Sequence, residues 1–154
     1  MRITTRGRYA LRASLALAKM GKDGSPVSIG DLSEQEHISS LFLEQIFFKL
    51  RKAGIVSSVR GPGGGFCFAQ PLENLTVKEI LDAAGEDLEL HPCERAADKI
   101  QNCDRIGCCL SHSVWVGVTE MLNDYFKNIT LASILERNSL KPEEERIHEA
   151  GNSG

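Results

Sequence analysis

Apolar residues recur at helical spacing through the N-terminal part of the chain. Between Thr5 and Met20 they fall three and four positions apart, which predicts a helix with one apolar face. Glycine and proline residues at 21–26 end this helix. Ser28, with Asp31 three positions later, has the pattern of a capping box and predicts the start of a second, shorter helix.

A third helical segment follows the turn sequence HISS. Ser39 or Ser40 is expected to cap it, and it extends to about Ala53. Its apolar stripe consists of Leu43, Ile46, Phe47 and Leu50, and the polar side chains off that stripe are Glu44, Gln45, Lys49, Arg51 and Lys52. Two short helices, a tight turn and a third helix with polar residues near its start predict a helix-turn-helix.

The pattern then changes from helical to strand-like. The sequences IVSSV and FCFA have strand character, and RGPGGG between them predicts a turn. A hairpin directly after a helix-turn-helix predicts the wing of a winged helix. Gly63, Gly64 and Gly65 are expected to permit positive φ angles and a close approach to a phosphate or a groove wall. Arg60 is expected at the tip, where it can enter a minor groove or pair with a phosphate, and Cys67 is interpreted as a strand-packing thiol.

The C-terminal half predicts helices separated by an irregular segment. Thr76 with Glu79 forms a capping box for a short helix, and periodicity is lost over 86–111. It returns from about Ser111 to Asn128, with an apolar face of Trp115, Val118, Leu122, Tyr125, Phe126 and Ile129. Too little chain remains to cover that face, so we expect a second copy of the same helix to pack on it; an ordinary core helix in a monomer is the alternative. Thr130 is expected to cap a short last helix.

Charge is divided unevenly along a chain of net charge −3. Residues 1–60 hold ten of the 18 Lys and Arg but only five of the 21 Asp and Glu. A basic N-terminal half suits contact with a polyanion on one side of the protein. An uneven distribution of solvated surface charges without any binding partner fits the sequence equally well. Candidates for phosphate contacts are Arg2, Arg6, Arg8 and either Lys49 or Arg51. No long apolar run predicts a membrane span or a signal peptide, so we expect a cytoplasmic protein.

Cysteine and histidine gather in the segment that lacks periodicity. Cys93, Cys103, Cys109 and His112 fall within twenty residues, and Cys108 adjoins Cys109. Thiolate and imidazole are the ligands that iron–sulfur clusters and zinc prefer, and this spacing does not match that of buried core residues. The paired C-x-x-C knuckles of structural zinc are absent. A thiol sensor, in which Cys108 or Cys109 forms a disulfide with Cys103, is a further alternative.

Three stretches carry a resemblance to a known family: MRITTRGRYALRA, LEQIFFKLRKAGIVSSVRGPGGGF and CLSHSVW with the later NITL. They closely resemble the IscR-like iron–sulfur cluster regulators, winged-helix proteins of the Rrf-two family, over about residues 1–135. The resemblance implies a homodimeric transcription regulator that binds double-stranded DNA. It also implies a 2Fe–2S cluster whose ligands fall on Cys93, Cys103, Cys109 and His112.

The chain departs from IscR in two places, the cysteine-bearing segment and the third helix. The interval between Cys93 and Cys103 is longer, and Cys108 is an additional thiol. Cys108 could replace Cys109 or His112 as a ligand, or support a 4Fe–4S cluster instead. In the third helix Leu41 stands where IscR has a small hydroxyl residue, so the preferred operator is expected to differ.

These observations combine into one expected architecture and function. The fold is expected to be mainly α with a small β-hairpin wing: a winged helix-turn-helix plus a long dimerisation helix. Residues 1–72 would form the DNA-binding domain, 73–137 the cluster-binding loop and dimerisation helices, and 138–154 an acidic flexible tail. Ser39, Ser40, Glu44 and Gln45 are expected nearest the bases, with Glu44 suited to cytosine and Gln45 to adenine. The DNA binding of this homodimer would respond to the cluster and control cluster biogenesis or stress genes.

Other functional classes are less compatible with the sequence. It has no Ser-His-Asp order, no paired carboxylates in a plausible pocket and no phosphate loop with a lysine, so we expect neither an enzyme nor a small-molecule substrate. Three alternatives within regulation remain: a nitric-oxide sensor, a thiol redox sensor and a zinc-stabilised DNA-binding protein without a cluster.

Overall fold

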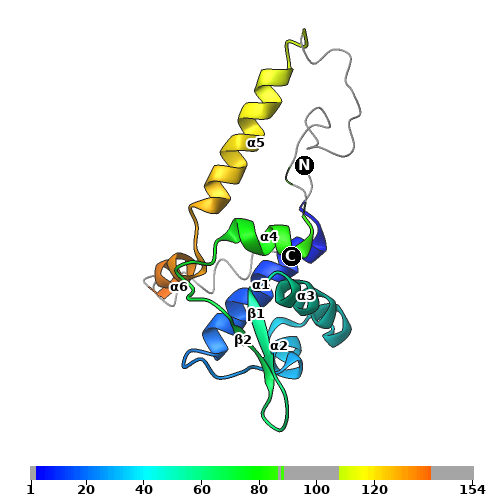
Figure 1. Ribbon diagram of the computed structural model, residues 1–154, viewed down its shortest axis with the longest axis vertical. Helices are drawn as coiled ribbons and strands as arrows, with labels where there is room; N and C mark the ends of the chain where they lie inside the picture. The colour runs from blue at the N-terminus through cyan, green and yellow to red at the C-terminus, as the bar shows by residue number, and fades with distance from the viewer. Residues whose placement is uncertain (1–2, 87, 89–107, 140–154) are drawn as a thin grey trace.

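The computed structural model describes residues 3–86, 88 and 108–139. Those residues form six helices and a two-stranded hairpin (Figure 1). The elements are α1 (Thr5–Met20), α2 (Ile29–Glu36), α3 (Ser40–Lys52), β1 (Val56–Val59), β2 (Gly65–Phe68), α4 (Val77–Ala84), α5 (His112–Lys127) and α6 (Leu131–Ser139). The predicted fold class, mainly α with a β-hairpin wing, is confirmed. The tail was predicted over 138–154, but residues 138 and 139 complete α6, and residues 140–154 lie outside the described residues, as does most of the irregular segment.

The predicted caps explain where α2 and α3 begin. The Ser28 hydroxyl accepts a hydrogen bond from the Asp31 amide at 3.1 Å, and the Ser39 hydroxyl accepts one from the Phe42 amide at 3.3 Å. Ser39 is therefore the cap of α3, and Ser40 is its first residue. Between the two helices, His37 adopts the left-handed conformation with φ of 54°. This residue makes the tight turn of the helix-turn-helix.

One hydrophobic core holds the N-terminal elements and α4 together. The predicted stripe of α3, Leu43, Ile46, Phe47 and Leu50, is completely buried in it. Leu75 and Ile80 from the α4 region and Leu131 from α6 are equally buried in the same core. The core thus extends across the domain boundary predicted at residue 72, and α4 packs on both α1 and α3.

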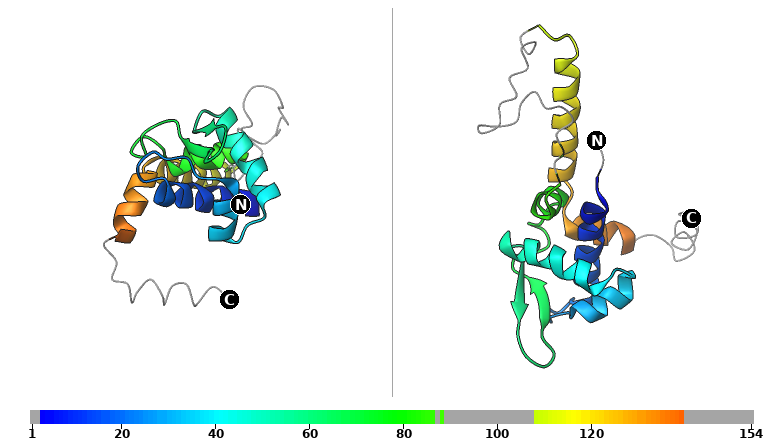
Figure 2. Two further views of the ribbon diagram at one scale, coloured as in Figure 1. Left: turned by 90° about the horizontal axis from the view of Figure 1, so that it is seen from below. Right: turned by 90° about the vertical axis from the view of Figure 1, so that its right-hand side faces the viewer.

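The hairpin is fixed to the body of the protein through β2. β1 and β2 are antiparallel, with Val56 opposite Phe68. The Phe66 amide donates to the Val27 carbonyl at 2.8 Å, and the Val27 amide donates to the Phe66 carbonyl at 2.9 Å. The Phe66 ring lies 4.9 Å from the Phe47 ring, between centroids. The hairpin is therefore anchored at its base, and its turn extends away from the helices (Figure 2).

Helix α4 connects the winged helix to α5. Its capping box is formed as predicted, because the Thr76 hydroxyl accepts from the Glu79 amide and the Glu79 carboxylate accepts from the Thr76 amide. The Val77 amide donates to the Ile129 carbonyl at 2.9 Å, which ties the beginning of α4 to the chain after α5. A second, smaller apolar cluster consists of Val77, Leu81 and Leu88, with Phe126 and Ile129 packed against it.

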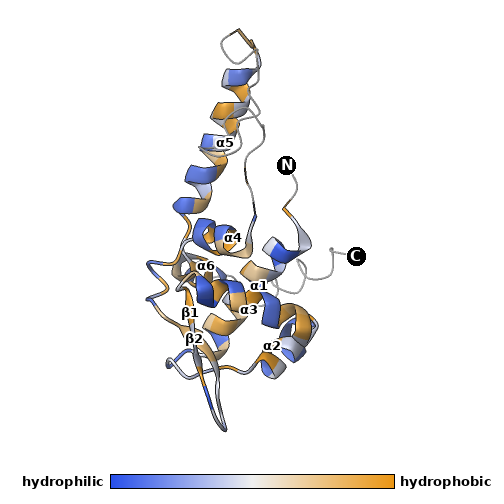
Figure 3. Cartoon of the chain, turned by 45° about the vertical axis from the view of Figure 1, so that its right-hand side comes forward, coloured by the Kyte–Doolittle hydropathy of each residue, from blue (hydrophilic) through white to orange (hydrophobic). Residues whose placement is uncertain are grey.

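Helix α5 projects away from the rest of the protein, on the end opposite the hairpin (Figures 1 and 2). None of its residues is buried among the described residues. Apolar positions recur along its length (Figure 3), and Trp115, Met121 and Tyr125 are among the exposed ones. No helix in the described part of the chain is both long and apolar enough to cross a membrane.

Candidate nucleic-acid interface and metal centre

Helix α3 presents one continuous exposed face opposite its buried stripe. Ser40, Leu41, Glu44, Gln45 and Phe48 are all exposed on it. Four of these residues were named from the sequence, whereas Phe48 was not. Leu41 and Phe48 keep 68% and 58% of their surfaces exposed. This face therefore combines hydrogen-bonding groups with apolar groups, as readers of the major groove do.

The turn of the hairpin is exposed, and Arg60 lies where β1 ends. Gly63 has φ of 73°, so the expected positive φ is confirmed there. Gly64 and Gly65 do not have positive φ, and their close approaches are to the chain itself. A Cβ atom on Gly64 would lie 2.4 Å from the Val59 carbonyl oxygen, and one on Gly65 would lie 2.2 Å from the Val27 carbonyl oxygen. These two glycines are therefore needed to build the wing, independently of any contact with DNA.

The basic candidates have different surroundings. Arg8 is exposed and donates to the Thr5 hydroxyl at 3.4 Å. Arg51 donates to the Ser58 hydroxyl at 3.3 Å, with its guanidinium 5.8 Å from the centre of the Phe48 ring, so it links α3 to the wing. Lys49 is half-buried, and its ammonium donates to the Ala84 carbonyl at 3.1 Å. Arg51 thus remains on the surface near the wing, whereas Lys49 has a partner inside the protein. Arg2 lies outside the described residues.

Two of the four expected metal ligands lie at the beginning of α5. The His112 amide donates to the Cys109 carbonyl at 3.2 Å, and this turn holds the two residues at the same end of the helix. Ser111 occupies the cap position but makes no side-chain cap hydrogen bond. Its hydroxyl lies 3.3 Å from the Cys109 sulfur instead. Cys109 and His112 are both half-buried, and Cys108 is exposed.

The donor chemistry at this position fits an iron–sulfur cluster. The same backbone turn carries one thiol and one imidazole, and the Ser111 hydroxyl beside the sulfur can donate a hydrogen bond to it. Cys93 and Cys103 lie outside the described residues, and within residues 3–86, 88 and 108–139 no three potential ligands gather as a metal site. Cys67 is remote in sequence from this group. It is half-buried in β2, with its sulfur 3.2 Å from the Ser57 hydroxyl on the neighbouring strand.

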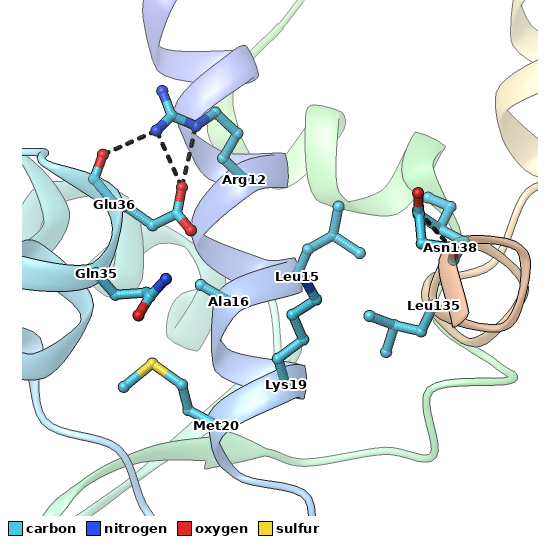
Figure 4. Close-up of a pocket in the computed structure, with 10 residues that line it drawn as sticks. Arg12, Leu15, Ala16, Lys19, Met20, Gln35, Glu36, Leu135 and Asn138 are labelled. Carbon is cyan, nitrogen blue, oxygen red and sulfur yellow. Dashed lines mark hydrogen bonds and ion pairs between the residues drawn. The ribbon is translucent and has the colours of Figure 1, made fainter. Parts of the chain in front are cut away.

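A separate pocket of about 360 Å³ lies between α1, α2 and α6 (Figure 4). Arg12 crosses from α1 to the end of α2, where its guanidinium bonds the Glu36 carboxylate at 3.1 Å and the Glu36 carbonyl at 2.8 Å. Leu15, Leu135 and Asn138 line the pocket on the side of α1 and α6. No cysteine or histidine lines it, so it is distinct from the Cys109–His112 site.

A buried carboxylate connects α4 to the beginning of α1. Glu86 is 7% exposed, and its carboxylate accepts hydrogen bonds from the Thr4 amide at 2.9 Å and from the Gly7 amide at 3.1 Å. Burial by itself raises the pKa of Glu86. Hydrogen bonds from Thr4 and Gly7 and the charge of Arg6 together lower it by more than burial raises it, so the pKa lies below its usual value. The group is thus an anion held on the first turn of α1. No sequence pattern indicated this role, because Glu86 is 79 residues from Gly7 along the chain.

A helix-turn-helix with an exposed recognition helix and an adjoining wing defines the class of winged-helix DNA-binding proteins. The Rrf2 family, described as iron-dependent transcriptional regulators, matches residues 3–137. An HTH-type transcriptional regulator of Haemophilus influenzae is 39% identical over 146 residues, which cover 95% of this chain and 94% of that protein. The regulator IscR of Photobacterium profundum is 38% identical over 141 residues, covering 92% and 79% of the two chains.

Similarity extends to a solved structure. The structure of IscR from T. potens matches with a TM-score of 0.70 and 28% identity, and the match covers 93% of each chain. The chain belongs to the Rrf2 family of transcriptional regulators. Its relatives are transcriptional regulators rather than enzymes, so the expectation that the chain is not an enzyme is confirmed.

Proposed function

We propose that this chain is a cytoplasmic, homodimeric transcription regulator whose affinity for operator DNA responds to an iron–sulfur cluster. The cluster would be held by Cys93, Cys103, Cys109 and His112, with 2Fe–2S as the expected type. The winged helix of residues 1–72 reads the operator, residues 73–139 sense and dimerise, and 140–154 form a tail. The observation that carries the proposal is that Cys109 and His112 lie in the same backbone turn, in which the His112 amide donates to the Cys109 carbonyl, at the beginning of the exposed helix α5.

The exposed face of α3 supports direct reading of bases. Glu44 and Gln45 are exposed in its first two turns, where helix-turn-helix proteins contact base edges. Gln45 can pair with adenine through two hydrogen bonds, and Glu44 can accept from the amino group of cytosine. Leu41 offers an apolar contact instead of a hydroxyl, and the methyl group of thymine is its natural counterpart.

The exposed apolar face of α5 supports a dimer. Trp115, Val118 and Tyr125 leave 47%, 37% and 61% of their surfaces exposed. Large contiguous apolar surface is rare on monomers and typical of interfaces. Phe126 belongs to the same predicted face, but it already packs against the small cluster of Val77 and Leu81 within the chain. We therefore assign the middle of α5, including Leu122, to the partner subunit, and Phe126 to the junction with α4.

The residues at the head of α5 support a bound group of the iron–sulfur type. Such a cluster supplies a redox-active centre that is lost or altered when iron is scarce or oxidants are present. The chain itself supplies a thiol at Cys109, an imidazole at His112 and a hydroxyl at Ser111 that can donate to the sulfur. These residues begin the helix assigned to the dimer interface. Binding or loss of the cluster would therefore change how the two subunits pack against each other.

The cluster is tested by its composition. Anaerobically purified protein is expected to absorb visible light and to contain iron and acid-labile sulfide. Cys109→Ala and His112→Ala are each expected to lose nearly all of the iron, because a cluster lacking a ligand is exposed to solvent and released. Cys67→Ala serves as the control and should retain the iron, since Cys67 lies in β2 beside Ser57.

The zinc-stabilised regulator and the thiol sensor each predict a different result in these measurements. Colourless protein that contains zinc would identify a zinc-stabilised regulator. Protein without metal that gains a disulfide between Cys103 and Cys108 or Cys109 on mild oxidation, seen by mass spectrometry, would identify a thiol sensor. Retention of full iron content by both Cys109→Ala and His112→Ala would contradict the proposed ligand set. The same analysis of Cys108→Ala shows whether this additional thiol is a ligand.

DNA readout is tested by two substitutions with different expected signatures. Gln45→Ala is expected to cost about 1–3 kcal/mol of discrimination at one base pair and to change which base is preferred there. Arg60→Ala is expected to weaken binding to all sequences and to reduce the slope of log K against log salt by about 1, because a phosphate contact is lost. Fluorescence anisotropy with operator variants at several salt concentrations measures both. An equal loss at every base with Gln45→Ala would remove this residue from the readout.

A further inference from the structure

The C-terminal end of α4 is bonded directly to the recognition helix. The Lys49 ammonium from α3 donates to the Ala84 carbonyl in the last turn of α4, at 3.1 Å. Gly85 follows in the left-handed conformation with φ of 87°, and a Cβ atom there would lie 3.1 Å from the Lys49 ammonium nitrogen. The helix end, its glycine and the lysine thus fit closely together. A displacement of residues 84–85 beyond the reach of the flexible Lys49 side chain breaks this hydrogen bond.

The next residue of the chain bonds to the beginning of α1. Glu86 accepts from the amides of Thr4 and Gly7 and, through a short hydrogen bond, from the Thr4 hydroxyl. A negative group is favourable at this position, since the first turn of a helix carries partial positive charge. A Cβ atom on Gly7 would lie 2.5 Å from the Glu86 Cγ atom, so the glycine is required for the carboxylate to reach the helix.

The location of these contacts along the chain gives them a role beyond packing. Residues 84–86 immediately precede the segment that contains Cys93 and Cys103. The other end of that segment leads into Cys109, His112 and α5. Helix α4 is also tied to the chain after α5, because the Val77 amide donates to the Ile129 carbonyl and the Leu131 amide donates to the Leu75 carbonyl, both at 2.9 Å. Helix α4 therefore leads into the cysteine-bearing segment and also contacts α1, α3 and α5, although its hydrogen bonds to the chain after α5 lie at the end of α5 remote from Cys109.

We propose that residues 84–86 form a joint through which the cysteine-bearing segment sets the position of the recognition helix, with Lys49 and Glu86 as its positioning residues. This inference rests on the proposed function, and it identifies the residues through which a change at the cluster would reach the recognition helix. The Glu86 carboxylate fixes the beginning of the segment to α1, and Lys49 fixes α3 to the same three residues. A change in the segment displaces the joint, and α3 moves with it.

The test measures coupling rather than affinity alone. Operator affinity is determined for the cluster-loaded and the iron-depleted dimer, and the ratio of the two values is the coupling factor, typically ~5- to 150-fold in allosteric proteins. Lys49→Met and Glu86→Gln are each expected to reduce this ratio to within about twofold of 1, because the path is cut. Lys49→Arg should preserve it, since a guanidinium can still donate to the Ala84 carbonyl. Lys52→Met is the matched control: Lys52 is exposed on the same helix, so losing its charge shifts both affinities and leaves their ratio unchanged.

A second measurement needs neither DNA nor cluster. Native-state hydrogen exchange of the iron-depleted protein should show faster exchange of the Gly7 amide in Glu86→Gln, while Lys52→Met leaves it unchanged. Thermal unfolding shows that each variant is folded under the conditions used. These readouts separate loss of the joint from general destabilisation.

The outcomes distinguish the joint from the proposed function. If wild-type affinity is the same with and without the cluster, the proposed function fails and the joint fails with it. If the wild-type ratio is large and persists in both Lys49→Met and Glu86→Gln, the proposed function stands and the joint alone is overturned. A ratio lost in both variants, kept in Lys52→Met and restored by Lys49→Arg supports the joint.

Discussion

Replacing Gly65 by alanine is expected to detach the wing and reduce operator affinity by at least tenfold, while the helices remain folded. The added Cβ atom would lie 2.2 Å from the Val27 carbonyl oxygen and 2.4 Å from its carbon, and both are rigid backbone atoms. Strand β2 must therefore move away from Val27. The two hydrogen bonds between Val27 and Phe66 would then break, and Phe66 would lose its position against Phe47.

The expected loss of stability is moderate compared with the loss of binding. Two backbone hydrogen bonds contribute about 1 kcal/mol each, and altered packing of one aromatic ring adds to this, giving about 2–4 kcal/mol in total. A domain stabilised by ~5–15 kcal/mol remains folded after such a change. Urea unfolding followed by circular dichroism measures the stability, and fluorescence anisotropy with operator DNA measures the affinity.

A second glycine provides the control. A Cβ atom on Gly30, in the first turn of α2, meets only the Ser28 hydroxyl, at an ordinary 3.5 Å. Gly30→Ala should therefore leave the wing attached and should not lower stability. If Gly65→Ala binds the operator as tightly as Gly30→Ala does, the wing is not part of the DNA-binding surface.

Replacing Val118 by aspartate is expected to convert the proposed dimer to monomers and to weaken operator binding by at least a hundredfold. Val118 is central to the exposed face of α5, between Trp115 and Leu122. A carboxylate buried there against a second subunit would face apolar groups without a partner, and an unpaired buried charge is strongly destabilising. Loss of the dimer removes simultaneous contact with two half-sites, which supplies much of the affinity of such regulators.

Sedimentation equilibrium measures the subunit state, and anisotropy measures operator binding. Glu120→Lys is the control, because Glu120 is exposed on the opposite side of α5 and this substitution changes the charge by two. It should leave the protein dimeric. A Val118→Asp protein that remains dimeric at micromolar concentration would show that the subunits meet through another surface.

The elements themselves were predictable because their signals are local. Ser28 with Asp31 and Thr76 with Glu79 each satisfy a helix end from a position three residues away, so the sequence spacing contains the whole interaction. The α3 stripe that begins at Leu43 is likewise a periodic pattern on one element, and its complete burial follows from that period.

The contacts that join elements were not predictable in the same way. Lys49 was interpreted as a candidate phosphate contact because it lies off the apolar stripe, and nothing in the spacing shows that its ammonium reaches Ala84, 35 residues later. Glu86 and Gly65 similarly depend on partners distant in sequence. The candidate metal site was predictable only in part. The clustering of Cys109 and His112 was evident, whereas Cys93 and Cys103 lie outside the described residues, and their ligand roles stay predictions.

The length of α5 limits how a signal can pass between its head and the DNA-binding face. The helix has 16 residues, which corresponds to about 24 Å at ~1.5 Å per residue, and the hairpin lies at the opposite end of the protein (Figure 1). Ions screen charges over about 8 Å at physiological salt, so a change of charge at Cys109 and His112 is largely hidden from the operator phosphates. If the proposed cluster controls DNA binding, its signal would therefore pass from the head of α5 as a displacement of packed elements, and the ratio of operator affinities with and without the cluster should be nearly independent of ionic strength.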